Sequence, residues 1–316
     1  MLDIKPANPQ TDYGRLAELY DAAHNRPISA DDLHARDRQL GENDIRLSFA
    51  AWLDERIIGY GYLSKQAASL DKHISLWVTI NEAFRGNGYG NQLYLHLVKL
   101  TDQYSYNQLE SECLDNDPIS LQFANNRGFG IRKHVFKNTL DLTQFDLSQW
   151  QHIIDSVEAN GIVFKTLKEV GSNETIQREI HELHNIAQHD NTMNDGRYQP
   201  SFEVWRKIVF EAFWFEPEMM TIAHDAQRIV GIGIASAGDD NPLARNGFLG
   251  VHPDYRGRRI ATALKIKGIA YAISKGATKI ITTNDSENYS MLAVNKKLGY
   301  RRDIGMYYVS TATPPE

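Results

Sequence analysis

The sequence is poor in the features that mark secreted, membrane-spanning or nucleic-acid-binding proteins. Cys113 is the only cysteine among 316 residues, so no intrachain disulfide can form, which fits a reducing cytoplasm. No apolar run approaches the roughly 20 residues that span a bilayer. The opening residues, MLDIKPANPQ, lack the basic and apolar segments of a secretory signal. The formal net charge of −6 argues against nucleic acid as the main partner. We therefore expect a cytoplasmic protein with no nucleic-acid or membrane partner.

What the chain does contain is one pattern that occurs twice. Residues 248–271 read FLGVHPDYRGRRIATALKIKGIAY, and residues 76–100 read LWVTINEAFRGNGYGNQLYLHLVKL. An offset of 171 residues separates Arg256-Gly257 from Arg85-Gly86 and also Gly299 from Gly128. A fixed offset held over this length indicates a duplication of one domain rather than a short-period repeat. The length of 316 residues suits two domains of about 150 residues each.

The repeated stretch has the order strand, small and cationic loop, helix. In the second copy an apolar run ends at Val251, and Ala261, Leu264 and Gly268 then recur at helical spacing. The first backbone N–H groups of a helix lack internal partners, and the helix dipole adds partial positive charge there. Gly257 allows close approach to the backbone. The stretch therefore predicts a phosphate-binding loop at a helix N-terminus.

The remaining pattern mixes helices and strands in the same order in both copies. Helices are predicted over 13–23, 174–188 and 201–215, hairpins over 46–65 and 219–237, and strands over 132–142 and 247–251. This order predicts an α/β (α+β) fold with a central mixed sheet flanked by helices in each copy. We expect an N-terminal domain over 1–145, a helical connector over 146–160 and a C-terminal domain over 161–316.

Each copy resembles the GCN5-related N-acetyltransferase (GNAT) superfamily. The family signature Arg/Gln-x-x-Gly-x-Gly/Ala is intact in copy one as Arg85-Gly86-Asn87-Gly88-Tyr89-Gly90. Copy two carries Arg256-Gly257-Arg258-Arg259-Ile260-Ala261, in which Arg259 stands where the family usually has glycine. The tandem arrangement is similar to that of mycothiol synthase, whose C-terminal copy carries the chemistry. By that analogy we expect copy two to be catalytic.

The resemblance implies an acetyl-CoA-dependent acyltransferase that acts on an amine of a small molecule or peptide by direct attack. In the family the loop amides hold the pyrophosphate of coenzyme A, and the fourth strand pairs with its pantetheine arm. The cofactor-binding residues implied here are Val78, Ile80, Arg85, Gly86, Asn87, Gly88, Tyr89, Gly90, Leu249, Val251, Arg256, Gly257, Arg258, Arg259, Ile260, Ala261, Asn284 and Asn295. Two fused copies are compatible with a monomer.

The proton-transfer groups are harder to assign. Many family members place a tyrosine acid four residues before the glycine of the Gly-aromatic ending, but Ala124 and Asn295 occupy those positions here. Asn295, Asp285 and Glu112 remain as catalytic candidates. A non-catalytic acyl-CoA-binding protein with degenerate sites is the alternative function.

A histidine-rich segment raises the question of a metal. His181, His184 and His189 lie in HELHNIAQH, which lacks the HExxH spacing that places two histidines and a catalytic glutamate on one helix face. We interpret this segment as a solvated helix face and expect no metal.

Overall fold

The computed structural model describes residues 1–24, 27–41, 43–65, 73–189, 192, 200–212, 215–237 and 242–311. Contacts divide the chain into two compact units: unit 1 comprises Met1–His134 and Ile304–Glu316, and unit 2 comprises Val135–Asp303. The predicted domain boundaries at residues 145 and 160 separate the two sequence copies rather than the two compact units, so they stay a prediction. The compact units divide elsewhere because each unit contains the last strand of the other copy.

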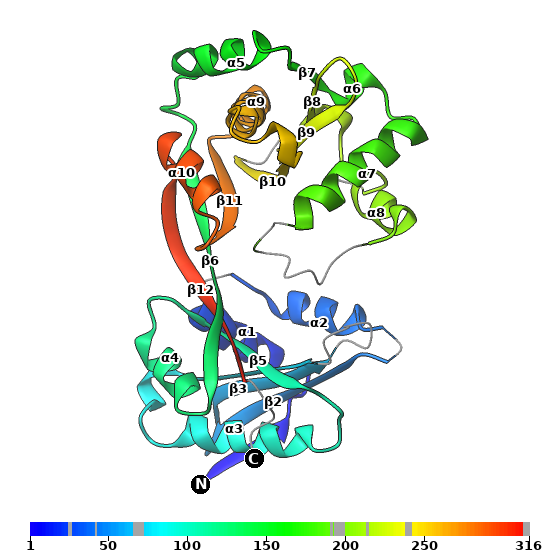
Figure 1. The fold of residues 1–316 in the computed structure, drawn as a ribbon. Coiled ribbons are helices and arrows are strands. Elements are labelled where there is room, and N and C mark those ends of the chain that lie inside the picture. The colour runs from blue at the N-terminus through cyan, green and yellow to red at the C-terminus, as the bar shows by residue number, and fades with distance from the viewer. Residues whose placement is uncertain are drawn as a thin grey trace. The chain divides into compact units, whose positions relative to one another are not determined.

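Unit 1 is a mixed sheet with helices on both faces (Figure 1). Its strands follow the order β1-β2-β3-β4-β5-β12, and β6 begins in this unit. Its elements are β1 (Leu2–Pro6), α1 (Tyr13–His24), α2 (Ala30–Arg38), β2 (Ile45–Leu53), β3 (Arg56–Lys65), β4 (His73–Ile80), η1 (Glu82–Phe84), α3 (Tyr89–Thr101), β5 (Gln108–Leu114), α4 (Pro118–Asn125), β6 (Phe129–Asp141) and β12 (Arg301–Thr311).

Two apolar clusters hold the helices of unit 1 to its sheet. On one face Leu16 and Tyr20 of α1 pack with Trp77 of β4. On the other face Leu93 and Leu97 of α3 pack with a second cluster that includes Val309 of β12. Helix α2 begins after Ser29, whose side chain accepts a hydrogen bond from the Asp32 N–H in a capping box.

Unit 2 repeats this architecture with the strand order β6-β11-β10-β9-β8-β7. Its elements are η2 (Leu147–Trp150), α5 (Gln151–Glu158), β7 (Val163–Thr166), α6 (Leu167–Val170), α7 (Glu174–His189), α8 (Phe202–Val209), η3 (Pro217–Met219), β8 (Met220–His224), β9 (Ile229–Ser236), β10 (Leu243–Val251), η4 (Pro253–Tyr255), α9 (Ile260–Ser274), β11 (Lys279–Asp285) and α10 (Tyr289–Lys297).

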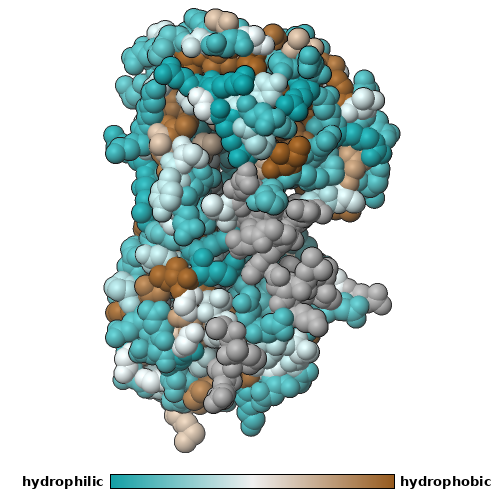
Figure 2. All heavy atoms as spheres, in the orientation of Figure 1, coloured by the Kyte–Doolittle hydropathy of each residue, from teal (hydrophilic) through white to brown (hydrophobic). Residues whose placement is uncertain are grey.

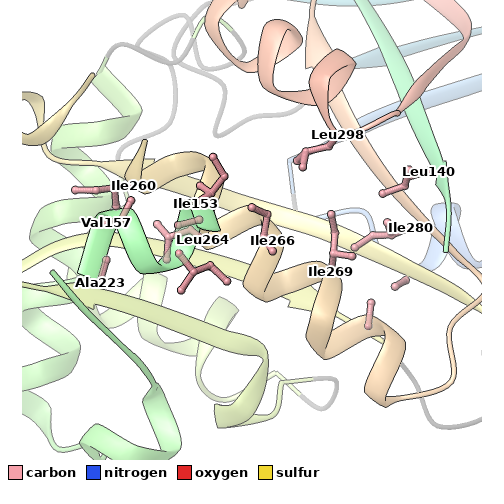
Figure 3. Packing of buried hydrophobic residues seen from close by; sticks show 14 of the residues in the cluster. Leu140, Ile153, Val157, Ala223, Ile260, Leu264, Ile266, Ile269, Ile280 and Leu298 are labelled. Carbon is pink, nitrogen blue, oxygen red and sulfur yellow. The ribbon is translucent and has the colours of Figure 1, made fainter. Parts of the chain in front are cut away.

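Helix α9 is buried on two sides in unit 2. Ile260 and Leu264 pack toward Ile153 and Val157 of α5, whereas Ile269 packs toward the cluster residues of β6, β11 and α10 (Figure 3). Helices α7 and α8 cover the other face of the sheet through a separate cluster. The predicted connector is helical, and its α5 segment is part of the unit 2 core because Ile153, Ile154 and Val157 are buried there.

Three predicted element bounds are wrong. Helix α8 ends at Val209 rather than at residue 215, because Phe210 caps it and packs edge-on against Trp205 and Phe215. Strand β10 begins at Leu243 rather than at residue 247, since its first residues pair with β11. Strand β6 begins at Phe129 rather than at residue 132.

The last strands of the two copies are exchanged between the units. Strand β6 ends copy one, yet Val135–Asp141 pair with Asp285–Lys279 of β11 in unit 2. Strand β12 ends copy two, yet Met306–Ser310 pair with Leu114–Glu110 of β5 in unit 1. Each unit therefore completes its sheet with a segment that the other sequence copy supplies.

The described surface in Figure 2 is mostly hydrophilic, as the composition leads one to expect. Hydrophilic residues predominate on the face drawn in Figure 2, and apolar residues form only small patches there. Within the described ranges no helix combines the length and apolarity needed to cross a membrane.

Candidate functional site

In each unit two neighbouring parallel strands are paired over only part of their length and then diverge. In unit 1 the pairing of β4 with β5 runs from His73↔Gln108 to Ser75↔Glu110 and stops there. In unit 2 the pairing of β10 with β11 ends at Arg245↔Ile281, next to an irregularity in β10 between Asn246 and Leu249. Beyond these points each strand pairs only with its outer neighbour, so a V-shaped opening faces the following helix.

A cavity of about 370 Å³ occupies the opening of unit 1. Residues 76–80 of β4 form one wall, and residues 111–114 of β5 form the other. The glycine loop lies at its mouth and contributes four of the predicted loop residues to the lining, namely Arg85, Gly86, Gly88 and Gly90. The structure thus brings the predicted residues Val78 and Ile80 and this loop to one cavity.

A larger cavity, of about 560 Å³, occupies the opening of unit 2. Residues 246–251 of β10 and residues 282–284 of β11 form its walls. The predicted cofactor residues that line it are Leu249, Val251, Arg256, Gly257, Arg259, Ile260, Ala261 and Asn284. The two cavities are equivalent in position, since most of their lining residues are related by the sequence offset.

The two loops share an unusual backbone. Gly86 and Gly88 have φ angles of +81° and +79°, and an added Cβ at either would meet no atom within 4 Å. Gly257 has φ +76°, and Arg259 has φ +62° although it is not glycine. These conformations turn the chain so that α3 begins after Gly88 and α9 begins after Arg259, which leaves the start of each helix at a loop that lines the cavity.

The first arginine of each loop secures the loop to the strand before it. Nε of Arg85 donates to the carbonyl of Ile80 at 3.1 Å, and Nε of Arg256 donates to the carbonyl of Val251 at 3.2 Å. Arg85 also reaches Asp117, the N-cap residue of α4, at 3.4 Å. These contacts fix where the loop amides point.

Three predicted loop residues do not line a cavity. The Asn87 side chain donates to the carbonyls of Phe84 and Arg85, so it braces the loop from outside. Arg258 lies over the Tyr255 ring, with its guanidinium carbon 4.8 Å from the ring centroid. Tyr89 packs against the apolar cluster of unit 1.

Glu112 lines the cavity of unit 1 and has a buried histidine partner. His24 Nε2 lies 2.9 Å from Glu112 Oε1, and His24 Nδ1 lies 3.0 Å from the carbonyl oxygen of Tyr20. A carbonyl only accepts, so Nδ1 carries a hydrogen, and the contact with Glu112 requires one further proton on either partner. The ring also stacks on Tyr20 at a centroid distance of 3.8 Å. The pair can therefore hold and exchange a proton at the cavity wall.

The other two catalytic candidates lie beside the cavity of unit 2 rather than in its wall. Asp285 is buried, and its Oδ1 accepts the Glu287 N–H, which is the role of a turn residue. Asn295 is buried and donates to Oδ1 of Asn284 at 2.7 Å, while Asn138 donates to the same oxygen at 3.1 Å. This amide cluster fixes the orientation of Asn284, which does line the cavity.

Lys265 is a cavity residue that the sequence patterns did not single out. It lies on α9, is only 2 % exposed, and lines the cavity of unit 2. Burial lowers the pKa of its amine to about 7. The sequence does hold one indication that Lys265 faces inward: it lies four residues after Ala261, which the helical spacing already places on the inward face.

One histidine expected at the surface is buried. The interpretation of the histidine segment as a solvated face is wrong for His184, which is 7 % exposed and lies 4.5 Å from the Phe248 ring between centroids. Burial lowers the pKa of His184, so the neutral ring is favoured.

Within the described residues, no group of three or more His, Cys, Asp or Glu side chains is arranged to hold a metal ion.

Both cavities fit a thioester cofactor with a charged end and an apolar arm. Loop amides at a helix N-terminus suit a pyrophosphate, and the parted strand edges offer backbone groups along an elongated arm. The thiol of Cys113, which lines the cavity of unit 1, has its pKa raised to about 11, mainly by burial, so it stays protonated.

Comparison with known proteins identifies this architecture. The model of the acetyltransferase (GNAT) family matches twice, over residues 14–129 and 180–300. A tandem GNAT protein of the clavulanic acid biosynthesis pathway has a similar fold over the whole of both chains, with a TM-score of 0.65 and 19 % identity.

Two curated relatives match in part. An acetyltransferase of Sodalis glossinidius is 32 % identical over 101 residues, which is 32 % of this chain and 66 % of that protein. A mycothiol acetyltransferase of Thermobispora bispora is 28 % identical over 94 residues, which is 28 % of this chain and 32 % of that protein. The matches thus span just under two thirds of the first relative and about a third of the second. With both halves matched by one family model, the chain belongs to the GNAT acetyltransferase family and carries two GNAT domains in tandem.

Proposed function

We propose that the protein transfers an acetyl group from acetyl-CoA to an amine of a small molecule or peptide. The observation that carries this proposal is the same in both units: parted parallel strands open a cavity that ends at a glycine loop and a helix N-terminus. A loop at a helix N-terminus suits the anionic end of an acyl-CoA, and family membership supports the reaction type.

In unit 1 the chain supplies a proton acceptor for this reaction. An amine that attacks a thioester must lose a proton to become an amide. Glu112 lines the cavity beside His24, so its ionised carboxylate can accept that proton as the C–N bond forms. Holding the amine beside the thioester supplies the rest of the acceleration through proximity.

The rival function is acyl-CoA binding without catalysis. Ala124 and Asn295 at the positions of the family tyrosine favour it. A panel of amines tested for acceptor-dependent release of the coenzyme A thiol separates the two functions. Binding without any such release would favour the binder.

The experiment that tests cofactor binding is a calorimetric titration of acetyl-CoA into the wild type, Gly88→Asp and Gly257→Asp. A carboxylate at either loop should repel the pyrophosphate. Gly88→Ala and Gly257→Ala are matched controls, because they impose the same positive-φ strain without charge. Two sites in the wild type, each lost with its own aspartate, would support two cofactor sites. Absence of binding at millimolar ligand would refute the coenzyme A proposal.

A further inference from the structure

We propose that Lys265 is the proton-transfer residue of unit 2, positioned to protonate the sulfur of coenzyme A as the acyl group leaves. This inference rests on the proposed function and extends it, because it gives the second unit a group that can do acid–base chemistry. The two units would then use different chemistry: a carboxylate–imidazole pair in unit 1 and an amine in unit 2.

The first argument is position. Helix α9 starts at the loop and runs beneath the opening between β10 and β11. Gly268 on this helix lies at the point where the two strands diverge. A Cβ built on Gly268 would lie 3.9 Å from Oδ1 of Asn246, which is the first residue of β10 after its last pair with β11. Lys265 precedes Gly268 by three residues, so it lies one turn nearer the loop on the same side of the helix. Lys265 therefore lines the cavity between the phosphate loop and the point where the strands diverge.

The second argument is that the fold does not require a lysine at this position. The equivalent residue of unit 1, at the offset of 171, is Tyr94. Its ring packs edge-on against Phe123 and Phe129, with centroid distances of 6.1 and 6.5 Å. An apolar or aromatic side chain thus serves the fold at this position, so the amine of Lys265 needs another explanation.

The third argument is the charge around the amine. No Asp or Glu among the described residues lines this cavity. The titratable neighbours are Tyr300, whose ring centroid lies 4.7 Å from Nζ, and three further residues that line the cavity, Tyr255, Arg256 and Arg259. Burial raises the pKa of Tyr300, so its hydroxyl stays protonated. Burial also brings the pKa of Lys265 to about 7, where both of its forms are populated at neutral pH.

The proton balance of the step closes within the site. The amine attacks the thioester carbon, and collapse of the adduct breaks the C–S bond, with the electron pair going to sulfur. The ammonium of Lys265 gives its proton to that sulfur and becomes a neutral amine. It then takes the proton that the acceptor nitrogen loses on becoming an amide, so Lys265 is unchanged after each turnover.

The test uses free coenzyme A as the probe, in the full-length chain with Gly88→Asp to block unit 1. Thiolate formation is followed by its ultraviolet absorbance against desulfo-coenzyme A as blank, across pH. A thiolate that forms beside Lys265 favours the ammonium form of the lysine, so the amine keeps its proton while the thiol loses its own, and the resulting ion pair stabilises the thiolate. We expect the pKa of the bound thiol to lie at least about one unit lower with Lys265 than with Lys265→Met, a tenfold difference in the ratio of thiolate to thiol.

Two further variants separate charge from proton transfer. Lys265→Arg should keep the shifted thiol pKa, because its guanidinium is cationic, yet lose roughly 10²-fold or more in turnover with an amine from the panel, because it cannot release a proton. Lys267→Met is the matched control, since Lys267 is on the same helix but lies near Glu158 and Phe164. It should behave as the wild type in both measurements.

Three results would overturn the proposal. An identical thiol titration in Lys265→Met, with coenzyme A still bound, would remove Lys265 from the sulfur while leaving the proposed function intact. Acetylation of Lys265 itself as a turnover intermediate, detected by mass spectrometry, would make it a nucleophile instead. Failure of unit 2 to bind coenzyme A in the Gly88→Asp background would overturn this inference, and the wild-type titration would then show whether unit 1 alone retains the proposed function.

Discussion

Gly88 and Arg259 occupy equivalent positions in the two loops, 171 residues apart, and both adopt a left-handed backbone as the residue that precedes a helix. Their φ angles are +79° and +62°. For a residue with a Cβ this conformation costs about 1–2 kcal/mol. Unit 2 thus tolerates strain at a ligand-facing position where unit 1 has glycine, which suggests that the Arg259 side chain contributes to binding.

Replacing Arg259 by glycine should separate stability from binding. Relief of the left-handed strain is partly offset by the extra freedom of glycine in the unfolded chain. We expect the free energy of unfolding in urea to stay the same or rise by up to about 1 kcal/mol. The affinity of unit 2 for acetyl-CoA should fall, because a cation leaves the mouth of the cavity. Unchanged affinity in calorimetry would show that the guanidinium does not contact the ligand.

The stability of the protein should depend on pH through Lys265. Burial lowers its pKa to about 7 in the folded state, whereas a lysine in an unfolded chain has a pKa of about 10.4. Between these values the unfolded state binds one more proton, so stability rises with pH by up to about 1.4 kcal/mol per unit.

Comparison of the wild type with Lys265→Met by urea unfolding from about pH 6 to about pH 9 isolates this contribution. Methionine should stabilise unit 2 most at the acidic end, where the buried ammonium is charged. The advantage should shrink steadily above neutral pH. A constant difference across the range would mean that the amine is already charged and paired in the folded protein.

The amide cluster of unit 2 predicts different costs for two similar substitutions. Asn284→Leu leaves the buried Nδ2 groups of Asn138 and Asn295 without their acceptor. Leaving buried donors unpaired should cost about 2–5 kcal/mol of unfolding free energy. Asn295→Leu removes one donor together with an Oδ1 that has no hydrogen-bond partner in the part of the chain that the structure describes, and it leaves the bond from Asn138 in place. It should therefore cost clearly less in the same measurement.

Unit 1 can be tested through its carboxylate. Glu112→Gln keeps the shape of the side chain but cannot accept a proton, so kcat with a responsive amine should fall roughly 10²-fold or more if unit 1 turns over. Binding of acetyl-CoA should be unchanged, because Glu112 lies on the wall away from the loop. Asp285→Asn serves as control, since Asp285 lines neither cavity. Full activity in Glu112→Gln would assign turnover to unit 2.

The duplication, the mixed sheets and both glycine loops could be predicted from sequence because they depend on local signals. Strand alternation, helical spacing and glycines at fixed positions each act over a few residues. Because the loops are recognised from these local signals, the loop residues that line the cavities, such as Gly88 and Gly257, could be predicted as well.

The rest depends on contacts between distant segments. Nothing near Glu112 in the sequence points to His24, 88 residues away. From the sequence, Asp285 is a candidate catalytic acid at the end of a strand, but in the fold its Oδ1 accepts a hydrogen bond from the Glu287 N–H. Lys265 resembles any surface lysine until the helix is seen to be buried on both sides. The exchange of β6 and β12 also has no local signal, because a strand that pairs within its own copy would show the same alternation.

That exchange sets an order on synthesis at the ribosome. Unit 2 is continuous from Val135 to Asp303, so all of it has been made before Ile304 is added. Unit 1 cannot be completed until residues after Asp303 are made, because β5 pairs with Met306–Ser310 and the core includes Val309. The half that is translated first is therefore the half that can be completed last. Until then its unpaired strand edge is open to other chains, so nascent unit 1 is protected from misassembly only once Met306–Ser310 have paired with β5.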